Sequence, residues 1–262
     1  MISKQNGITF IKSKKLLNNK ITHAFLSRNG GVSQGIFQNL NCRINSGDDP
    51  ENIKKNLTLV SNLFGYKKNQ LILLKQIHSN KVIHINNSKE NPLIEGDALV
   101  TNHSKILLGV ITADCVPTLI YDKKSNLVAA IHAGWKGAFY DIIQNTVNKL
   151  ASLKANLDET IAVIGPCIRE KNYLVSDDFY DRFILQNKTN SIYFRFNEKQ
   201  SQYTFNLPKY CYDIINKCGI KNIDDLNFDT YTEKNLFFSC RRSTDKGEKL
   251  FGGQISIIGF KN

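Results

Sequence analysis

Short apolar runs dominate the chain, and between them lie a few longer segments whose apolar residues repeat at helical spacing. Runs of about four to eight apolar or β-branched residues, bounded by polar or turn residues, are typical of strands. By this criterion the sequence predicts strands at 8–11, 22–27, 71–76, 81–85, 106–112, 118–121, 127–132, 161–165, 191–196, 236–241 and 254–260.

The clearest predicted helix begins after Asp49, a favourable N-cap residue followed by Pro50, and ends at Gly65. Further helices are predicted after Gly137, over 139–150, and at 177–185 and 208–218. Several strands follow one another without a helix between them, which does not fit a simple doubly wound parallel sheet. We therefore expect an α+β fold in which a strand-rich sandwich carries its helices outside.

Length and composition indicate one folded domain over residues 1–262. Hydrophobic residues make up 41% and charged residues 22% of the chain, as in ordinary globular proteins. The first residues lack the apolar core of a signal peptide, and no stretch has the apolar length of a bilayer span. We expect a cytoplasmic protein without a membrane partner, with its six cysteines reduced because no C-x-x-C pair or dense disulfide pattern is present.

The formal net charge of +12 raises the question of an anionic partner. The lysines are scattered, however, and do not form the arginine-rich or aromatic-interleaved stripe of a nucleic-acid surface. We expect no nucleic-acid partner. A small anionic substrate remains compatible with the charge.

Candidate chemistry concentrates in residues 109–137, GVITADCVPTLIYDKKSNLVAAIHAGWKG, where polar residues stand at the ends of apolar runs. Asp114 and Cys115 follow one run, and His132 ends another. His78 lies in KQIHSNKV, at a predicted turn between two strands. A thiolate and two imidazoles suit zinc and leave a fourth position open for chemistry. The same residues also fit buried inert side chains, or a Cys–His hydrolase with Cys115 as nucleophile and His132 as base.

Sequence blocks spread over nearly the whole chain resemble the YfiH family, which is also described as a laccase-domain or polyphenol oxidase family, as purine nucleoside phosphorylase and as peptidoglycan editing factor. The blocks occur in the family's order, from SRNGGVSQGIFQNLN and GDDPENIKKN through QIHSNKV, DALVT, TADCVPTLIYD, AAIHAGWKGA and IGPCI to FFSCRR and GGQISIIGF. The resemblance implies a single-domain, four-layer α/β/β/α sandwich. It also implies one zinc ion bound by His78, Cys115 and His132, with copper as an alternative metal in vitro.

The resemblance further implies a purine-nucleoside pocket beside the metal. Family members are described as splitting adenosine, inosine, guanosine and methylthioadenosine with phosphate, and as deaminating adenosine. In deamination, zinc-activated water would attack the purine ring, and Asp114 is the nearest candidate for moving protons. Catalytic roles are thus predicted for Asp114 and Cys115. The predicted substrate contacts are Arg28 for phosphate and Asn41 and Gln76 for the ribose or base, with Lys136 and Arg241 as further anion candidates.

Several positions depart from the family's pattern. Cys42 and Arg43 replace small or apolar residues after the LN pair, and Leu174 stands where an acid is common. Asp229 replaces a cysteine, and Cys240 replaces a tyrosine before the paired arginines. These departures concern the pocket and substrate preference and leave the three metal ligands intact.

Other classes of function compete with nucleoside chemistry. A laccase needs more imidazoles than the five histidines here can supply, and the H-x-E…P-C-x-x-C signature of nucleobase deaminases is absent. A peptidoglycan-precursor editing amidase using the same Cys/His/zinc site is the main alternative. A non-enzymatic scaffold would have no need of an open metal site. The sequence leaves the oligomeric state open.

Overall fold

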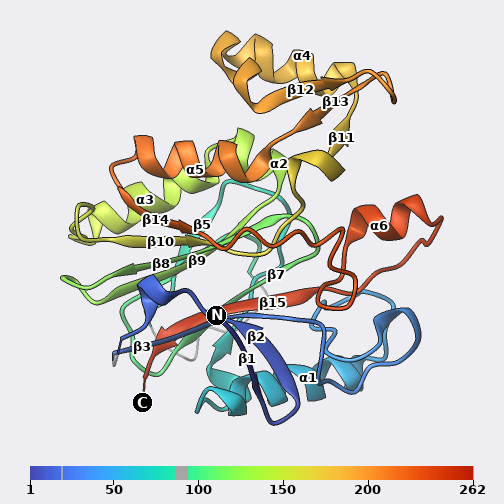
Figure 1. Ribbon diagram of the computed structural model, residues 1–262. Helices are drawn as coiled ribbons and strands as arrows, with labels where there is room; N and C mark the ends of the chain where they lie inside the picture. Colours follow the sequence, from blue (N-terminus) through green and yellow to red (C-terminus); the bar gives the residue numbers. More distant parts are fainter. Residues whose placement is uncertain (19, 87–93, 262) are drawn as a thin grey trace.

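The computed structural model, which describes residues 1–18, 20–86 and 94–261, packs two six-stranded sheets face to face and covers their outer faces with helices (Figure 1). The resulting order of layers is α/β/β/α, which confirms the predicted fold class. No helix in the described ranges is long and apolar enough to cross a membrane.

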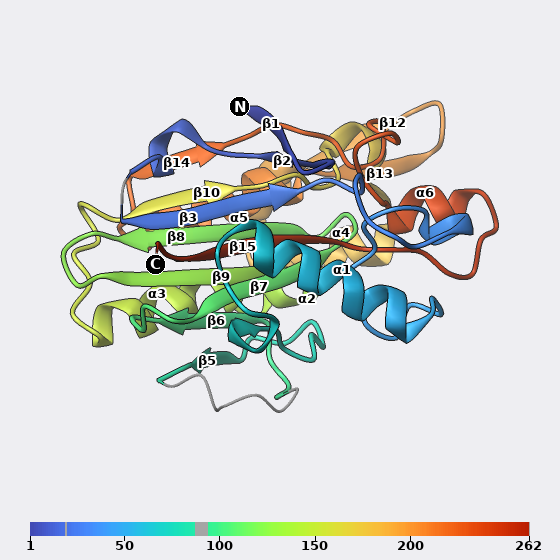
Figure 2. The ribbon, with the colours of Figure 1, turned by 90° about the horizontal axis from the view of Figure 1, so that it is seen from below.

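The first sheet has the strand order β1-β2-β3-β15-β7-β4. Its neighbours are antiparallel except β4 and β7, which run parallel. Helix α1 (Pro50–Leu63) covers the outer face, with Ile53, Leu57 and Val60 buried against the sheet. Figure 2 shows α1 lying across these strands. The strands are β1 (Ile2–Gln5), β2 (Ile8–Ile11), β3 (Ile21–Leu26), β4 (Leu71–Ile72), β7 (Leu107–Thr112) and β15 (Gln254–Phe260).

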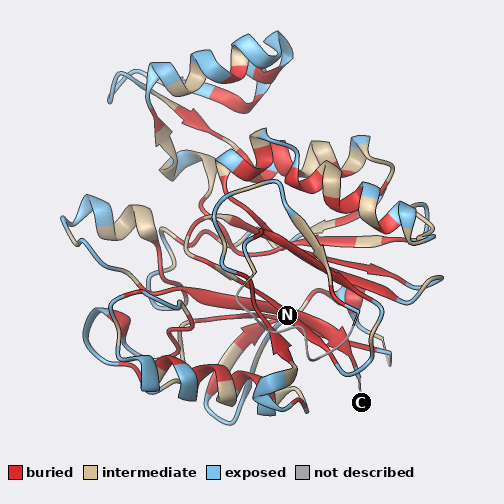
Figure 3. Cartoon of the chain, turned by 180° about the vertical axis from the view of Figure 1, so that it is seen from behind, coloured by how far each residue is buried: buried red, intermediate tan, exposed pale blue. Residues whose placement is uncertain are grey.

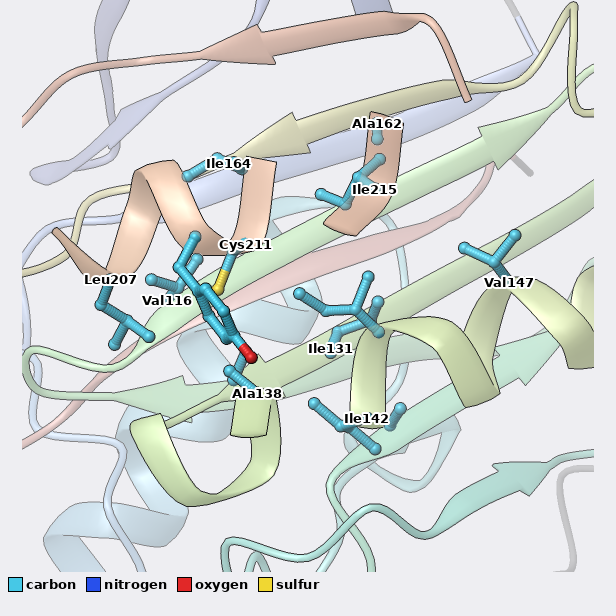
Figure 4. Close-up of a cluster of buried hydrophobic side chains, with 14 of the residues drawn as sticks. Val116, Ile131, Ala138, Ile142, Val147, Ala162, Ile164, Leu207, Cys211 and Ile215 are labelled. Atoms are coloured by element: carbon cyan, nitrogen blue, oxygen red, sulfur yellow. The ribbon is translucent and has the colours of Figure 1, made fainter. Parts of the chain in front are cut away.

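The second sheet has the order β14-β10-β8-β9-β6-β5 and carries helices α3 (Ile142–Ser152) and α5 (Leu207–Lys217) on its outer face. Figure 4 shows Ile142 and Val147 of α3, and Cys211 and Ile215 of α5, pointing onto the sheet. The strands are β5 (Val82–His84), β6 (Ala98–Thr101), β8 (Val116–Asp122), β9 (Leu127–Ala133), β10 (Ile161–Ile164) and β14 (Asn222–Asp225).

The main core lies between the two sheets. Phe25, Val110 and Ile258 from the first sheet share one buried apolar cluster with Leu119 and Val163 from the second. Figure 3 shows buried strands at the centre of the molecule and exposed positions on the outer helices. Because alternate side chains of a strand point to opposite faces, the strands buried on both faces appear in the sequence as nearly continuous apolar runs.

A small lobe stands above α5 and consists of a third sheet, β11-β13-β12, packed with helix α4 (Asp177–Gln186) (Figure 1). Aromatic rings hold it together. Phe183 and Phe205 lie 4.8 Å apart between ring centroids, and Phe194 stacks on Phe205 at 4.7 Å. Its strands are β11 (Leu174–Val175), β12 (Phe194–Asn197) and β13 (Gln202–Phe205).

The remaining helices are short connections around the sheets. Two are α-helical and five are 3-10 turns in the described ranges. They are α2 (Trp135–Phe139), α6 (Cys240–Asp245), η1 (Lys14–Leu16), η2 (Gly35–Phe37), η3 (Lys68–Gln70), η4 (Glu170–Asn172) and η5 (Lys188–Tyr193).

The predicted strand at 236–241 is wrong. Ser239 caps α6 by accepting a hydrogen bond from the Arg242 amide, and the Arg242 guanidinium donates to the carbonyls of Thr230, Tyr231 and Phe237. Side chains therefore satisfy Phe237 and Phe238, because Arg242 donates to the Phe237 carbonyl and the Gln254 amide bonds to both the amide and the carbonyl of Phe238. The predicted strand at 191–196 begins only at Phe194, because η5 occupies the preceding residues.

In the predicted strand at 71–76, backbone pairing with a neighbouring strand ends at Ile72. Beyond it, the Gln76 side-chain amide takes over the pairing with β7. Its Nε2 donates to the Ile111 carbonyl at 2.7 Å, and its Oε1 accepts from the Ile111 amide at 2.7 Å. One side chain thus replaces one step of sheet pairing at the edge of β7.

Candidate metal centre

Three side chains from separate segments of the chain meet at one end of the second sheet. His132 lies in β9, Cys115 immediately precedes β8, and His78 lies in the loop between β4 and β5. Their ligand atoms all lie within 4.8 Å of one another, and Cys115 Sγ is 3.7 Å from His78 Nε2. Ligand atoms around a tetrahedral zinc ion stand about 3.5 Å apart, given bonds of about 2.0–2.3 Å. This group fits a single metal ion.

Asp97, just before β6, orients both histidines. Its Oδ1 lies 2.8 Å from His132 Nδ1, and the same carboxylate accepts from the amide of His78 at 3.0 Å and from the amide and hydroxyl of Ser79, both at 2.6 Å. Engaging Nδ1 leaves His132 Nε2 as the ring nitrogen available for a metal. Sequence reasoning missed Asp97, although an acid directly before the apolar run of DALVT was the available signal.

The electrostatics of the site favour a thiolate. Burial opposes ionisation of Cys115, but His132 and His78 beside it outweigh burial and lower the pKa of the thiol. Burial likewise opposes a charge on His132, and the neighbouring Cys115 and Asp97 raise its pKa. Asp97 is also buried, yet its hydrogen bonds to His132 and Ser79 lower its pKa to about 2. A thiolate is the form of cysteine that binds metals.

The backbone around the ligands is shaped to bring them close. His78 has φ 58° and Asp114 has φ 90°, backbone angles that residues other than glycine rarely adopt. Gly134, which follows the β9 ligand strand, leaves the space the cluster needs. A Cβ at this position would lie 2.5 Å from His78 Cδ2 and 3.0 Å from Cys115 Sγ.

The three ligands open onto a cavity of about 450 Å³, which is within the range of small-molecule sites. Its walls come from the loop after Asn41, the segment after β4, the end of β7 and the C-terminal segment around α6. The lining residues are Arg43, Ile44, Asn45, Leu73, Leu74, Lys75, Gln76, His78, Ile111, Thr112, Ala113, Cys115, His132, Cys240 and Phe251.

Of the three predicted substrate residues, the structure brings only Gln76 to this cavity, and its amide is engaged with Ile111. Asn41 is fully buried behind the wall and bonds to Ser46, Asp48 and the loop backbone. Arg28 lies outside the lining, 4.2 Å from the Phe238 ring, with its guanidinium near two backbone carbonyls. Their substrate roles stay predictions.

Asp114 is buried and holds three segments together. Its carboxylate accepts from Thr230 Oγ1 at 2.6 Å, Ser239 Oγ at 2.9 Å and the Arg241 amide at 2.7 Å. Burial raises its pKa, against these hydrogen bonds. Asp114 does not line the cavity. The predicted proton transfer would therefore require its carboxylate to give up these hydrogen bonds.

The two further anion candidates also lie outside the cavity lining. Arg241 donates to the Leu174 carbonyl at 2.8 Å and lies over Tyr173. The Lys136 ammonium lies 5.6 Å from the Trp135 ring centroid.

Fold and site together define a layered α+β protein in which three side chains that could hold a metal ion open onto a cavity. The family model described as "Multi-copper polyphenol oxidoreductase laccase" matches residues 22–261. The chain belongs to this family, the YfiH or DUF152 family, which confirms the resemblance found in the sequence.

Similar proteins extend over almost the whole chain. A protein named purine nucleoside phosphorylase from Haemophilus influenzae is 34% identical, covering 92% of this chain and 96% of its own. A Rickettsia conorii protein of the same name is 31% identical, covering 94% and 99%. The crystal structure of Neisseria meningitidis protein NMB0706, of family DUF152, is 29% identical with a TM-score of 0.84, covering 98% and 100%. That of the Bacillus licheniformis hypothetical protein YfiH is 26% identical with a TM-score of 0.88, covering 99% of each chain.

Proposed function

We propose that this protein is a zinc-dependent purine nucleoside phosphorylase that acts on adenosine, inosine, guanosine and S-methyl-5'-thioadenosine and also deaminates adenosine. The observation that carries the proposal is the meeting of His78, Cys115 and His132 at a cavity of about 450 Å³. Relatives named purine nucleoside phosphorylase support the choice of substrate. The proposal places the enzyme in the cytoplasm, together with free nucleosides and phosphate.

The donor set supports zinc as the metal. One thiolate and two imidazoles suit zinc, and three protein ligands leave one position open. Copper would bind the same donors, but the group accounts for one ion only, whereas a laccase needs several. When bound, zinc supplies Lewis-acid polarisation and activation of water near neutral pH.

The chain's own residues would bind and orient the substrate. Leu73, Leu74 and Ile111 give the cavity apolar walls suited to a purine face, and Asp97 holds the ligand geometry from behind. In phosphorolysis a phosphate oxygen bonds to C1′ of the ribose while the bond from C1′ to the base nitrogen breaks and the base takes up a proton. In deamination, water replaces the amine of adenosine and ammonia leaves.

The test is product analysis of the zinc-loaded protein with adenosine, inosine and methylthioadenosine, each with and without phosphate. We expect phosphate-dependent release of free base and release of ammonia from adenosine. Cys115→Ala, which removes one ligand, should lose both activities along with its zinc. Metal content measured on the same samples separates loss of metal from loss of fold.

A result in which all three nucleosides survive, while the wild type binds zinc, would overturn the nucleoside proposal. Amide hydrolysis of a peptidoglycan precursor, independent of phosphate, would then be the activity to measure on the same protein. The Cys115→Ala variant serves as the control in that assay as well.

A further inference from the structure

Arg43 is the arginine that reaches the metal cavity. It lines the same cavity as His78, Cys115 and His132. Its guanidinium stacks 3.8 Å from the centroid of Phe251, and Nη1 donates to the Phe251 carbonyl at 3.1 Å. The stacking fixes the plane of the guanidinium, whose Nε and Nη2 have no protein acceptor in the described part of the chain.

The charge of Arg43 is not neutralised by the protein. Among the described residues no carboxylate lines the cavity, and none forms an ion pair with Arg43. The second cation of the lining, Lys75, is exposed and paired with Glu95 at 2.8 Å. Arg43 therefore contributes the uncompensated positive charge of this wall, which favours an anionic ligand.

A buried hydroxyl lies on the same wall. Thr112, at the end of β7, lines the cavity with 3% of its surface exposed, and its Oγ1 has no hydrogen-bond partner in the described chain. An unpaired buried hydroxyl is costly. This one is enclosed by protein atoms, so a ligand in the cavity would meet the Arg43 guanidinium and not Thr112 Oγ1. Gly253 packs beside this part of the wall, because a Cβ there would meet Arg43 Cβ at 3.0 Å and the backbone carbonyl of Thr112 at 3.5 Å.

Asn41 holds this wall in place. Its Oδ1 accepts from the amides of Arg43 at 3.0 Å and Gly253 at 2.9 Å, and its Nδ2 donates to Ser46 and Asp48. One buried amide thus joins the loop that carries Arg43 to the segment that carries Phe251. The arrangement is preorganised, because its hydrogen bonds lie within the protein and need no ligand.

We propose that Arg43 binds the phosphate co-substrate beside the metal centre, in place of Arg28. The inference rests on the proposed function and names the residue that recognises its anionic substrate. A guanidinium offers phosphate two N–H donors in a fixed plane, which an ammonium cannot match. Arg28, by contrast, lies outside the lining and stacks on Phe238.

The experiment compares zinc-loaded wild type with Arg43→Met, Arg43→Lys and Lys54→Gln. Methionine keeps an apolar contact with Phe251, and lysine keeps the charge. Lys54→Gln removes an exposed lysine of α1 that is paired with Glu51 and lies outside the cavity lining, and it serves as the control. Phosphorolysis of inosine is measured against phosphate concentration, and binding of inorganic phosphate without nucleoside is measured by calorimetry. Zinc content and thermal unfolding are checked for each variant.

We expect Arg43→Met to raise the KM for phosphate roughly 10- to 100-fold, the cost of one charged hydrogen-bonding partner, with the KM for inosine nearly unchanged. Arg43→Lys should recover part of this loss, and Lys54→Gln should behave like wild type. Calorimetric phosphate binding should weaken in parallel. A purely structural arginine would lower zinc content or stability without moving the two KM values apart.

The outcomes separate this inference from the proposed function. Phosphorolysis with an unchanged KM for phosphate in Arg43→Met overturns the inference and leaves the proposed function standing. Absence of phosphorolysis, combined with calorimetric phosphate binding that needs Arg43, supports the anion site and overturns the phosphorylase proposal. If the zinc-loaded wild type binds no phosphate by either measurement, the inference is overturned.

Discussion

At the scale of single residues, Asp97 determines how the two histidines of the candidate metal centre are presented. It is fully buried, bonds to the ring of His132 and accepts from the backbone of the His78 loop. A carboxylate behind a ligating histidine fixes both its tautomer and its ring orientation. Asp97 thereby positions both His132, in strand β9, and His78, in the loop before β5.

Asp97→Asn is expected to lower zinc affinity roughly 10- to 100-fold, because the amide keeps the shape of the carboxylate but loses its charge and one acceptor. Competition with a chelator measures the affinity. Glu95→Gln, two positions away and exposed, is the matched control and should leave it unchanged. Equal zinc affinity in both variants would contradict an orienting role for Asp97.

Gly134→Ala is expected to abolish stoichiometric zinc binding while the protein stays folded. The added methyl would approach His78 Cδ2 to 2.5 Å, and His78 lies in a loop that can move away more easily than β9. Metal analysis and circular dichroism of the purified variant test this. Full zinc occupancy in Gly134→Ala would show that the ligands tolerate a side chain there.

At the scale of elements, Asp114 connects the turn before β8 to the segment that leads into α6. Thr230, Ser239 and Arg241 all donate to it, and its left-handed backbone brings the carboxylate inward. Because these donors come from residues more than a hundred positions away, Asp114 links the ends of distant elements.

Asp114→Asn is expected to destabilise the fold by about 1–3 kcal/mol, since the amide presents a donor where donors already converge. Asparagine tolerates the left-handed backbone, so strain does not confuse the comparison. Denaturant unfolding measures the loss, and zinc stoichiometry should be retained. Unchanged stability with a large fall in kcat would instead support the predicted proton-transfer role.

The elements that could be predicted were those whose local signals agree with their packing. The helix after Asp49 was predicted from its cap and apolar spacing, and its observed range is Pro50–Leu63. The strand at 236–241 failed because its apolar residues are buried without a partner strand. Strand β6 is not among the predicted strands, because its apolar run is only four residues long. The block DALVT nevertheless carries both this strand and Asp97.

The meeting of His78, Cys115 and His132 could be predicted from the family resemblance, whereas spacing along the chain does not reveal which side chains meet. Gln76 lines the cavity, but its amide pairs with β7, and its substrate contact stays a prediction. Arg28 and Asn41 did not reach it, since their polar groups bond within the protein. Arg43 was noticed only as a departure from the pattern, because its position depends on Phe251, far away in the sequence.

At the scale of the whole molecule, stability should depend on the charge of His23, a buried residue of β3 whose Nε2 accepts from the Ser13 amide at 3.0 Å. Burial, with nearby Lys12, lowers its pKa from 6.5 to about 4. The unfolded chain binds this proton near pH 6.5 and the folded protein only near pH 4. Its contribution is therefore complete above about pH 6.5 and is lost as the pH falls toward 4.

The expected loss from this one group between about pH 7 and pH 4.5 is roughly 2–3 kcal/mol. Denaturant unfolding at both pH values measures it. His23→Gln keeps an acceptor for Ser13 but cannot be protonated, so its unfolding free energy should vary less with pH than that of wild type. An identical pH dependence in the two proteins would rule out His23 as its source.

The position of β15 in the first sheet has a consequence for biosynthesis. It lies between β3 and β7, although it comes far later in the sequence than either of them. After β3 and β7 have left the ribosome, the strand edges that β15 will join therefore stay uncovered until β15 has been synthesised. Exposed strand edges invite pairing with other chains, so a nascent chain of this protein should depend on chaperones for longer than one whose sheets close in order of synthesis.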